Sequence, residues 1–120
     1  MDEKKVILTK LDELEMEYQK AQKQLDRTME EALSEKDHFN RDLENLGNDL
    51  SYVFRTQEYT IDVRQAYNML EGAQEDSTSF FKTIRQKLED DQDDLTSHYK
   101  KKVAFYEEDL DLLKRKESTK

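Results

Sequence analysis

Two histidines and one acidic run are the residues of this chain whose types could support metal binding or acid–base chemistry. His38 and His98 are isolated: neither has a second histidine within helical reach, and the motif H-E-x-x-H does not occur. A zinc site requires three or four converging ligands. We therefore interpret both histidines as surface side chains or as residues at the edge of a helix seam.

The acidic run Glu89–Asp94 offers carboxylates that could hold a divalent cation loosely. A calcium loop of the EF-hand type, however, needs a glycine at its sixth position and a glutamate at its end, and this run supplies neither. The sequence also contains no glycine-rich phosphate loop and no nucleophile elbow. We expect no catalytic residue, no cofactor, no cofactor-binding residue and no metal ligand, and hence no enzymatic activity.

The composition is typical of long helices. Charged residues make up 41% and hydrophobic residues 34% of the chain, there are two glycines, and proline, cysteine and tryptophan are absent. Such sequences favour long helices or coiled coils, although low hydrophobicity with a net charge of −9 is also compatible with disorder. The negative charge opposes binding to phosphate backbones, so we expect no nucleic-acid partner.

Apolar residues recur every three or four positions, which predicts two long amphipathic helices. The helices are expected over about residues 3–55 and 61–117, with a turn at about 56–60. β-branched and aromatic residues cluster near this midpoint, and Thr60 can cap the second helix. The prediction is an all-α fold, a long antiparallel two-helix hairpin that resembles a coiled coil and forms a single unit over residues 1–120.

The glycines mark weak points in the two helices. Gly47 lies inside the first apolar pattern and is expected to be tolerated there. Gly72 and the polar residues after it interrupt the second pattern. We predict one helix that is kinked or weak near Gly72–Ser77. The alternative is a break, followed by a new helix that Ser77 or Thr78 caps.

Each predicted helix carries one narrow apolar stripe. A narrow stripe on a long helix cannot bury itself, so it must pack against another helix. In the first helix the stripe consists of Ile7, Leu11, Leu14, Tyr18, Ala21, Leu25, Met29, Ala32, Phe39, Leu43, Leu46, Leu50 and Val53, with Lys36 as a polar break. In the second it consists of Val63, Tyr67, Leu70, Phe81, Ile84, Leu88, Leu95, Tyr99, Val103, Tyr106, Leu110 and Leu113, with Gln92 filling a gap.

Further apolar residues lie outside the stripes and indicate a second interface. They are Leu8, Met16, Leu33, Tyr52, Phe54, Tyr59, Met69, Phe80, Phe105 and Leu112. The alternative is that they only broaden the stripes. The candidate partner-binding residues are Phe81, Ile84, Leu88, Leu95 and Tyr99 of the stripe, and Tyr52, Phe54 and Tyr59 outside it. A homodimer and a different helical partner are both compatible with such an interface.

The N-terminus has only Val6–Leu8 as an apolar run, and no stretch approaches the length of a membrane helix or the apolar core of a signal peptide. We therefore expect a cytoplasmic protein that does not insert into membranes and carries no Sec-type signal. If the protein leaves the cell, it does so by a route that accepts helical proteins or together with a partner.

Several short segments of the second half carry a resemblance to a known family. They are Asp76–Thr78, Phe81–Thr83, Leu88–Asp90, Asp93–Leu95, Tyr106–Leu110 and Lys114–Lys116. In these segments the chain resembles small helical accessory proteins of Gram-positive bacteria, WXG-like in general character, that are encoded beside LXG polymorphic toxins of the type VIIb secretion system. The resemblance covers mainly residues 74–117, and the first helix agrees only in character. The chain lacks the Trp-x-Gly turn of the main WXG-like family.

The resemblance implies a targeting factor for toxins of interbacterial competition. Such proteins are thought to bind the helical N-terminal LXG region of a toxin, alongside a second small WXG-like protein, and to present it for export. In this system an aromatic residue followed four positions later by an acid acts as an export signal, and Phe105 with Asp109 has this spacing, as does Tyr67 with Glu71. The implied function is a cytoplasmic adaptor or chaperone, with export alongside its partner left open. The alternative is a self-associating coiled-coil scaffold or structural protein unrelated to secretion.

Overall fold

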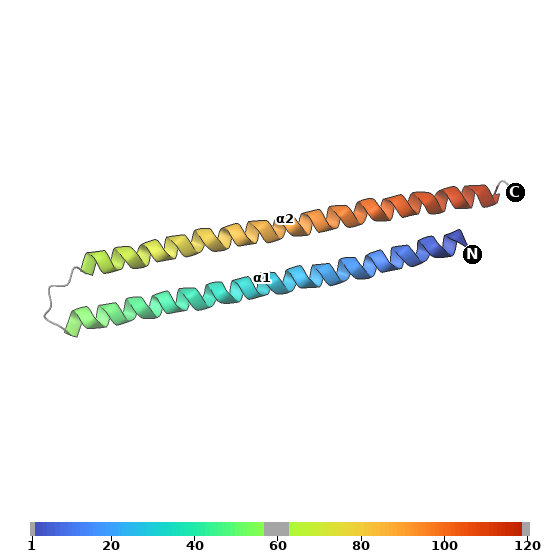
Figure 1. Cartoon of the computed structure of the whole chain (residues 1–120). Helices are drawn as coiled ribbons and strands as arrows, with labels where there is room; N and C mark the ends of the chain where they lie inside the picture. Colours follow the sequence, from blue (N-terminus) through green and yellow to red (C-terminus); the bar gives the residue numbers. More distant parts are fainter. Residues whose placement is uncertain (1, 57–62, 119–120) are drawn as a thin grey trace. The chain divides into compact units, whose positions relative to one another are not determined.

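The computed structural model of the chain describes residues 2–56 and 63–118. Two helices, α1 (Glu3–Thr56) and α2 (Val63–Ser118), account for nearly all of them (Figure 1). The predicted all-α antiparallel two-helix hairpin is thus confirmed. Thr56, expected in the turn, still belongs to α1. The rest of the expected turn and the expected cap at Thr60 lie outside the described residues.

Asp2 caps the N-terminus of α1. Its Oδ1 accepts a hydrogen bond from the main-chain N–H of Lys4 (3.1 Å), and its main-chain oxygen accepts one from that of Val6 (3.2 Å). A carboxylate here satisfies a donor that lacks a partner within the helix and interacts favourably with the helix dipole. In the last turns, Arg55 of α1 and Arg115 of α2 place positive charge where the dipole favours it.

Contacts divide the two helices into two compact units. Unit 1 consists of Met1–Arg27 and Leu88–Lys120, and unit 2 consists of Thr28–Lys87. In each unit a segment of α1 lies beside a segment of α2 (Figure 1), so each unit is a helix pair with its own seam. That residues 1–120 act as a single unit stays a prediction.

In unit 1 the predicted stripes face each other. Tyr18 stacks on Tyr99, while Ile7 and Leu113 line one hollow nearer the start of α1 and the end of α2. Residue numbers therefore rise along α1 as they fall along α2, which makes the pair antiparallel. The half-buried stripe residues of this unit are Ile7, Leu11, Leu14, Tyr18, Ala21, Leu25, Leu88, Leu95, Tyr99, Val103, Tyr106, Leu110 and Leu113.

In unit 2, small residues of α2 form the seam with α1 in the region where the sequence predicts a weak point. Ser77 is only 7% exposed and Ala73 is half-buried, so both continue the seam that Leu70 begins. Thr78 is not a cap, because its Oγ1 donates a hydrogen bond to the main-chain oxygen of Gln74 (3.0 Å) inside the helix. α2 is therefore continuous through Gly72–Ser77, and the alternative of a break with a new helix start is excluded.

Candidate partner-binding surface

Seven large hydrophobic side chains are exposed among the described residues of unit 2: Leu33, Phe39, Leu46, Tyr52, Tyr67, Met69 and Phe80. Four of them form two pairs, Phe39 (42% exposed) with Leu46 (49%) on α1 and Met69 (70%) with Phe80 (60%) on α2. Phe39 and Leu46 are seven residues apart on α1, and Met69 and Phe80 are eleven apart on α2. Both spacings are close to whole numbers of helical turns, so each pair lies on one side of its helix. We refer to these four residues as the apolar face of unit 2.

A hollow joins the two halves of this face. It is lined by Phe39 of α1 and by Ala73, Asp76, Ser77, Phe80 and Phe81 of α2. The rings of Phe80 and Phe81 meet edge to face, with 5.4 Å between centroids and 76° between planes. Because Ala73 and Ser77 have small side chains, they leave room between the aromatic rings contributed by the two helices.

Acidic side chains border the apolar face of unit 2. We refer to Glu35, Asp42 and Asp49 of α1 and Asp76 of α2, all exposed, as the acidic border. Its three members on α1 repeat every seven residues, and each is three or four residues from a member of the face. Asp76 lines the hollow itself. Lys87, seven residues after Phe80, adds one positive charge at the end of the unit.

A second hollow of unit 2 has the opposite charge. It is lined by Met29, Ala32, Leu33, Lys36, Thr78, Phe81, Lys82 and Arg85, and we refer to it as the cationic hollow. Phe81 lines both hollows, so they adjoin at this side chain. Lys36, the polar break in the predicted stripe, is half-buried here. A lysine can cover apolar surface with its methylene groups while its ammonium group stays hydrated.

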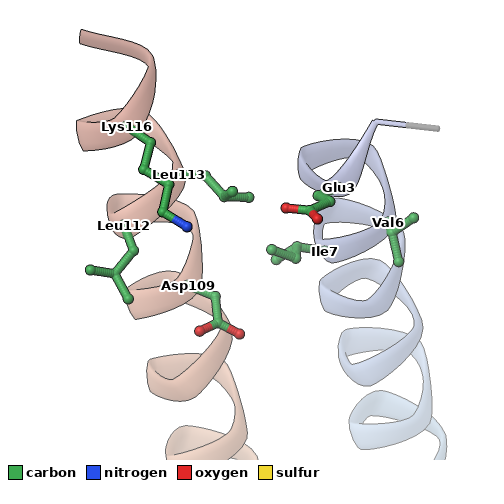
Figure 2. A pocket seen from close by; sticks show the side chains of 7 residues that line it. All are labelled: Glu3, Val6, Ile7, Asp109, Leu112, Leu113 and Lys116. Carbon is green, nitrogen blue, oxygen red and sulfur yellow. The ribbon is translucent and has the colours of Figure 1, made fainter. Parts of the chain in front are cut away.

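Unit 1 has its own hollow, where α1 begins and α2 ends (Figure 2). Ile7 and Leu113 point toward each other across it, whereas Leu112 points away from α1. Asp109, one half of the export signal that the resemblance implies, lines this hollow and is half-buried. Phe105, the other half, is exposed. Their role as a signal stays a prediction.

The predicted partner-binding residues lie in different environments. Phe81, Ile84, Leu88, Leu95 and Tyr99 are half-buried along the seams. Tyr52 is exposed, Phe54 is half-buried and packs against the ring of Tyr67 with 6.1 Å between centroids, and Tyr59 lies outside the described residues. The structure adds Phe39 and Leu46, which the sequence pattern placed in the stripe. Together with Met69 and Phe80, they form an exposed apolar surface of unit 2.

The residues considered for metal or acid–base chemistry do not converge. His38 and His98 are both exposed. Among the residues that the structure describes, no group of three or more His, Cys, Asp or Glu side chains is arranged to hold a metal ion. Within the same residues, neither helix combines the length and the apolar character that crossing a bilayer requires.

The comparisons with known proteins give no significant match to a family model, to a curated protein or to a solved structure.

Proposed function

We propose that this protein is a non-enzymatic adaptor that binds a helical region of another protein by helix packing. The observation that supports it is the apolar face of unit 2, which remains exposed although both seams are packed. Contiguous exposed apolar surface is typical of protein-interaction sites. Removing such surface from water contributes roughly 25 cal/mol for each Å² buried.

The docked segment would itself be an amphipathic helix. A helix laid along the hollow between Phe39 and Phe80 would contact α1 and α2 together and convert the helix pair of unit 2 into a three-helix arrangement. Such docking requires no active site, since the interaction consists of side chains that pack in a groove.

We propose the helical N-terminal LXG region of a polymorphic toxin as the partner, and type VIIb export of that toxin as the biological purpose. The resemblance of residues 74–117 to accessory proteins of this system supports the choice. This range includes Asp76 and Phe80, which line the hollow of unit 2. A second small WXG-like protein is proposed as a further partner. The adaptor would bind the toxin in the cytoplasm, and export alongside it would follow from the same complex.

Co-expression tests the adaptor function. The full chain is produced with the helical N-terminal region of an LXG toxin encoded beside it, and the product is analysed by size-exclusion chromatography with light scattering. We expect a stable one-to-one complex. Elution as two separate species would contradict the proposal. A tight homodimer without affinity for the toxin region would support the self-associating scaffold instead.

The proposed export signal is tested by a separate substitution. We expect Phe105→Ala to abolish export of the toxin while the complex still forms, since Phe105 is exposed and lies outside unit 2. Leu112→Ala is the matched control, because Leu112 is also an exposed apolar residue of α2 in unit 1. Equal export with both variants would exclude Phe105 as part of a signal.

A further inference from the structure

The apolar face of unit 2 presents anchors on both sides of one hollow. Phe39 projects from α1 and Phe80 from α2, while Ala73 and Ser77 lie between them. Leu46, two helical turns from Phe39, and Met69, one turn before Ala73, extend the face in the same direction along the antiparallel pair. The surface therefore suits the apolar stripe of a single helix that lies along the seam.

The negative charge of the acidic border determines which kind of amphipathic helix is attracted to the apolar face of unit 2. Three of its members follow the α1 side of the face, and Asp76 stands on the α2 side. A helix seated between them would bring the residues that flank its own stripe close to three carboxylates on the α1 side and to Asp76 on the α2 side, where Lys87 adds one positive charge at the end of the unit. Lysine or arginine at these flanking positions would be attracted, whereas glutamate or aspartate would be repelled.

A second copy of this chain matches the surface less well than a basic helix, because both copies carry the acidic border. In a two-fold dimer that packs α1 against α1, the acidic border of one copy would face that of the other, and like charges that face each other oppose association. Pairing of the apolar face of one copy with the cationic hollow of another would match the charges. That contact joins two different surfaces, however, so it generates rings or open filaments rather than a closed dimer.

We infer that the apolar face of unit 2 is the docking site for an amphipathic helix of another protein, whose apolar stripe is flanked by lysine or arginine. The inference rests on the proposed adaptor function and specifies the chemistry of the partner.

Two synthetic helical peptides test it. They carry the same leucine stripe, flanked by lysine and arginine in one and by glutamate in the other. Binding to the full chain is measured by fluorescence anisotropy at low and high salt. We expect the basic peptide to bind at least about ten-fold more tightly, because several exposed charge pairs each add a fraction of a kcal/mol. This preference should shrink as salt screens the charges.

Substitutions locate the site. Met69→Asp should weaken binding of the basic peptide by about ten-fold or more, since it places a charge among the apolar anchors. Met16→Asp in unit 1 is the matched control, because both methionines are 70% exposed. Circular dichroism verifies that each variant keeps its helix content. Asp42→Lys combined with Asp76→Lys should shift the preference toward the acidic peptide.

The possible results distinguish a failure of the docking site on unit 2 from a failure of the adaptor function. Equal or stronger binding of the acidic peptide, no binding of either peptide, or equal effects of Met69→Asp and Met16→Asp would each overturn the inference. Concentration-dependent self-association that Met69→Asp abolishes would overturn it as well, in favour of a second copy. If the complex with the toxin region nevertheless forms and tolerates Met69→Asp, the adaptor function stands and uses another surface.

Discussion

Tyr18 of α1 and Tyr99 of α2 stack face to face in the seam of unit 1, with 4.2 Å between ring centroids and 8° between ring planes. The hydroxyl of Tyr18 also lies 3.0 Å from Thr96 Oγ1 and accepts a hydrogen bond from Gln22 Nε2 (3.1 Å). One side chain thus combines ring stacking across the seam with a polar link to the same facing helix. Such specific contacts help to fix the register of two helices whose apolar stripes are otherwise repetitive.

The Tyr18 hydroxyl should contribute measurably to stability. We expect Tyr18→Phe to lower the free energy of unfolding by about 1 kcal/mol, because Thr96 and Gln22 lose a partly buried partner while the ring stack remains. Tyr18→Leu should cost about a further 1 kcal/mol, since it removes the aromatic pair. Urea unfolding followed by circular dichroism measures both. Tyr99→Phe is the control, with an expected change below about 0.5 kcal/mol. A loss at Tyr99 equal to that at Tyr18 would contradict this account.

The two glycines should be replaceable by alanine with a gain in stability. A Cβ added at Gly47 would lie 3.8 Å from Leu70 Cδ1, an ordinary van der Waals contact, and one added at Gly72 would meet nothing within 4 Å. Neither glycine has a positive φ. We expect each substitution to raise the free energy of unfolding by about 1 kcal/mol, because alanine loses less backbone entropy in a helix. A lower melting temperature for Gly47→Ala would show that the seam of unit 2 cannot accept a methyl group there.

Ser77 is the buried polar residue of unit 2 whose replacement should stabilise the chain. Its Oγ is buried and forms no hydrogen bond with the residues that the structure describes. We expect Ser77→Ala to raise the free energy of unfolding by about 1 kcal/mol, since it removes an unsatisfied hydroxyl and improves helix propensity. Ser79→Ala, at an exposed position of the same helix, measures the effect of helix propensity alone. It should raise the free energy of unfolding by only about half as much. Equal gains in the two variants would mean that the Ser77 hydroxyl is not unsatisfied in solution.

The periodic apolar pattern was sufficient to predict the helices, because a three- or four-residue repeat without proline is compatible with few other structures. The region near Gly72–Ser77 was harder to predict for a physical reason. Ala73 and Ser77 lie in the seam, but their small side chains contribute little to a hydropathy pattern, so the sequence predicts one weak or kinked helix and leaves a break as the alternative. α2 is continuous through this region, and the burial of Ser77 in the seam is the tertiary contact that can offset weak local helix propensity.

The accessible surface was only partly predictable. Met69 and Phe80 lie outside the stripe and were expected at a second interface. Phe39 and Leu46 of α1 and Tyr67 of α2 fit the predicted stripes, although all three are exposed. A two-helix seam is narrow, so a residue with the correct spacing can still lie at its edge, depending on which small or large side chain faces it. The spacing of apolar residues within one helix does not reveal which side chain of the other helix faces each of them.

Substitutions in the seam and on the apolar face of unit 2 should separate folding from binding. Leu43 is only 9% exposed, so we expect Leu43→Ala to lower the free energy of unfolding by about 2 kcal/mol or more. Met69→Ala removes a side chain of similar size from an exposed position and should change stability by less than about 0.5 kcal/mol. Urea unfolding measures the two costs, and the peptide titration measures binding of each variant at a temperature where both remain folded. We expect Leu43→Ala to bind normally and Met69→Ala to bind several-fold more weakly. If Met69→Ala were as destabilising as Leu43→Ala, Met69 would belong to the folded core of unit 2 and could not serve as an anchor for a partner.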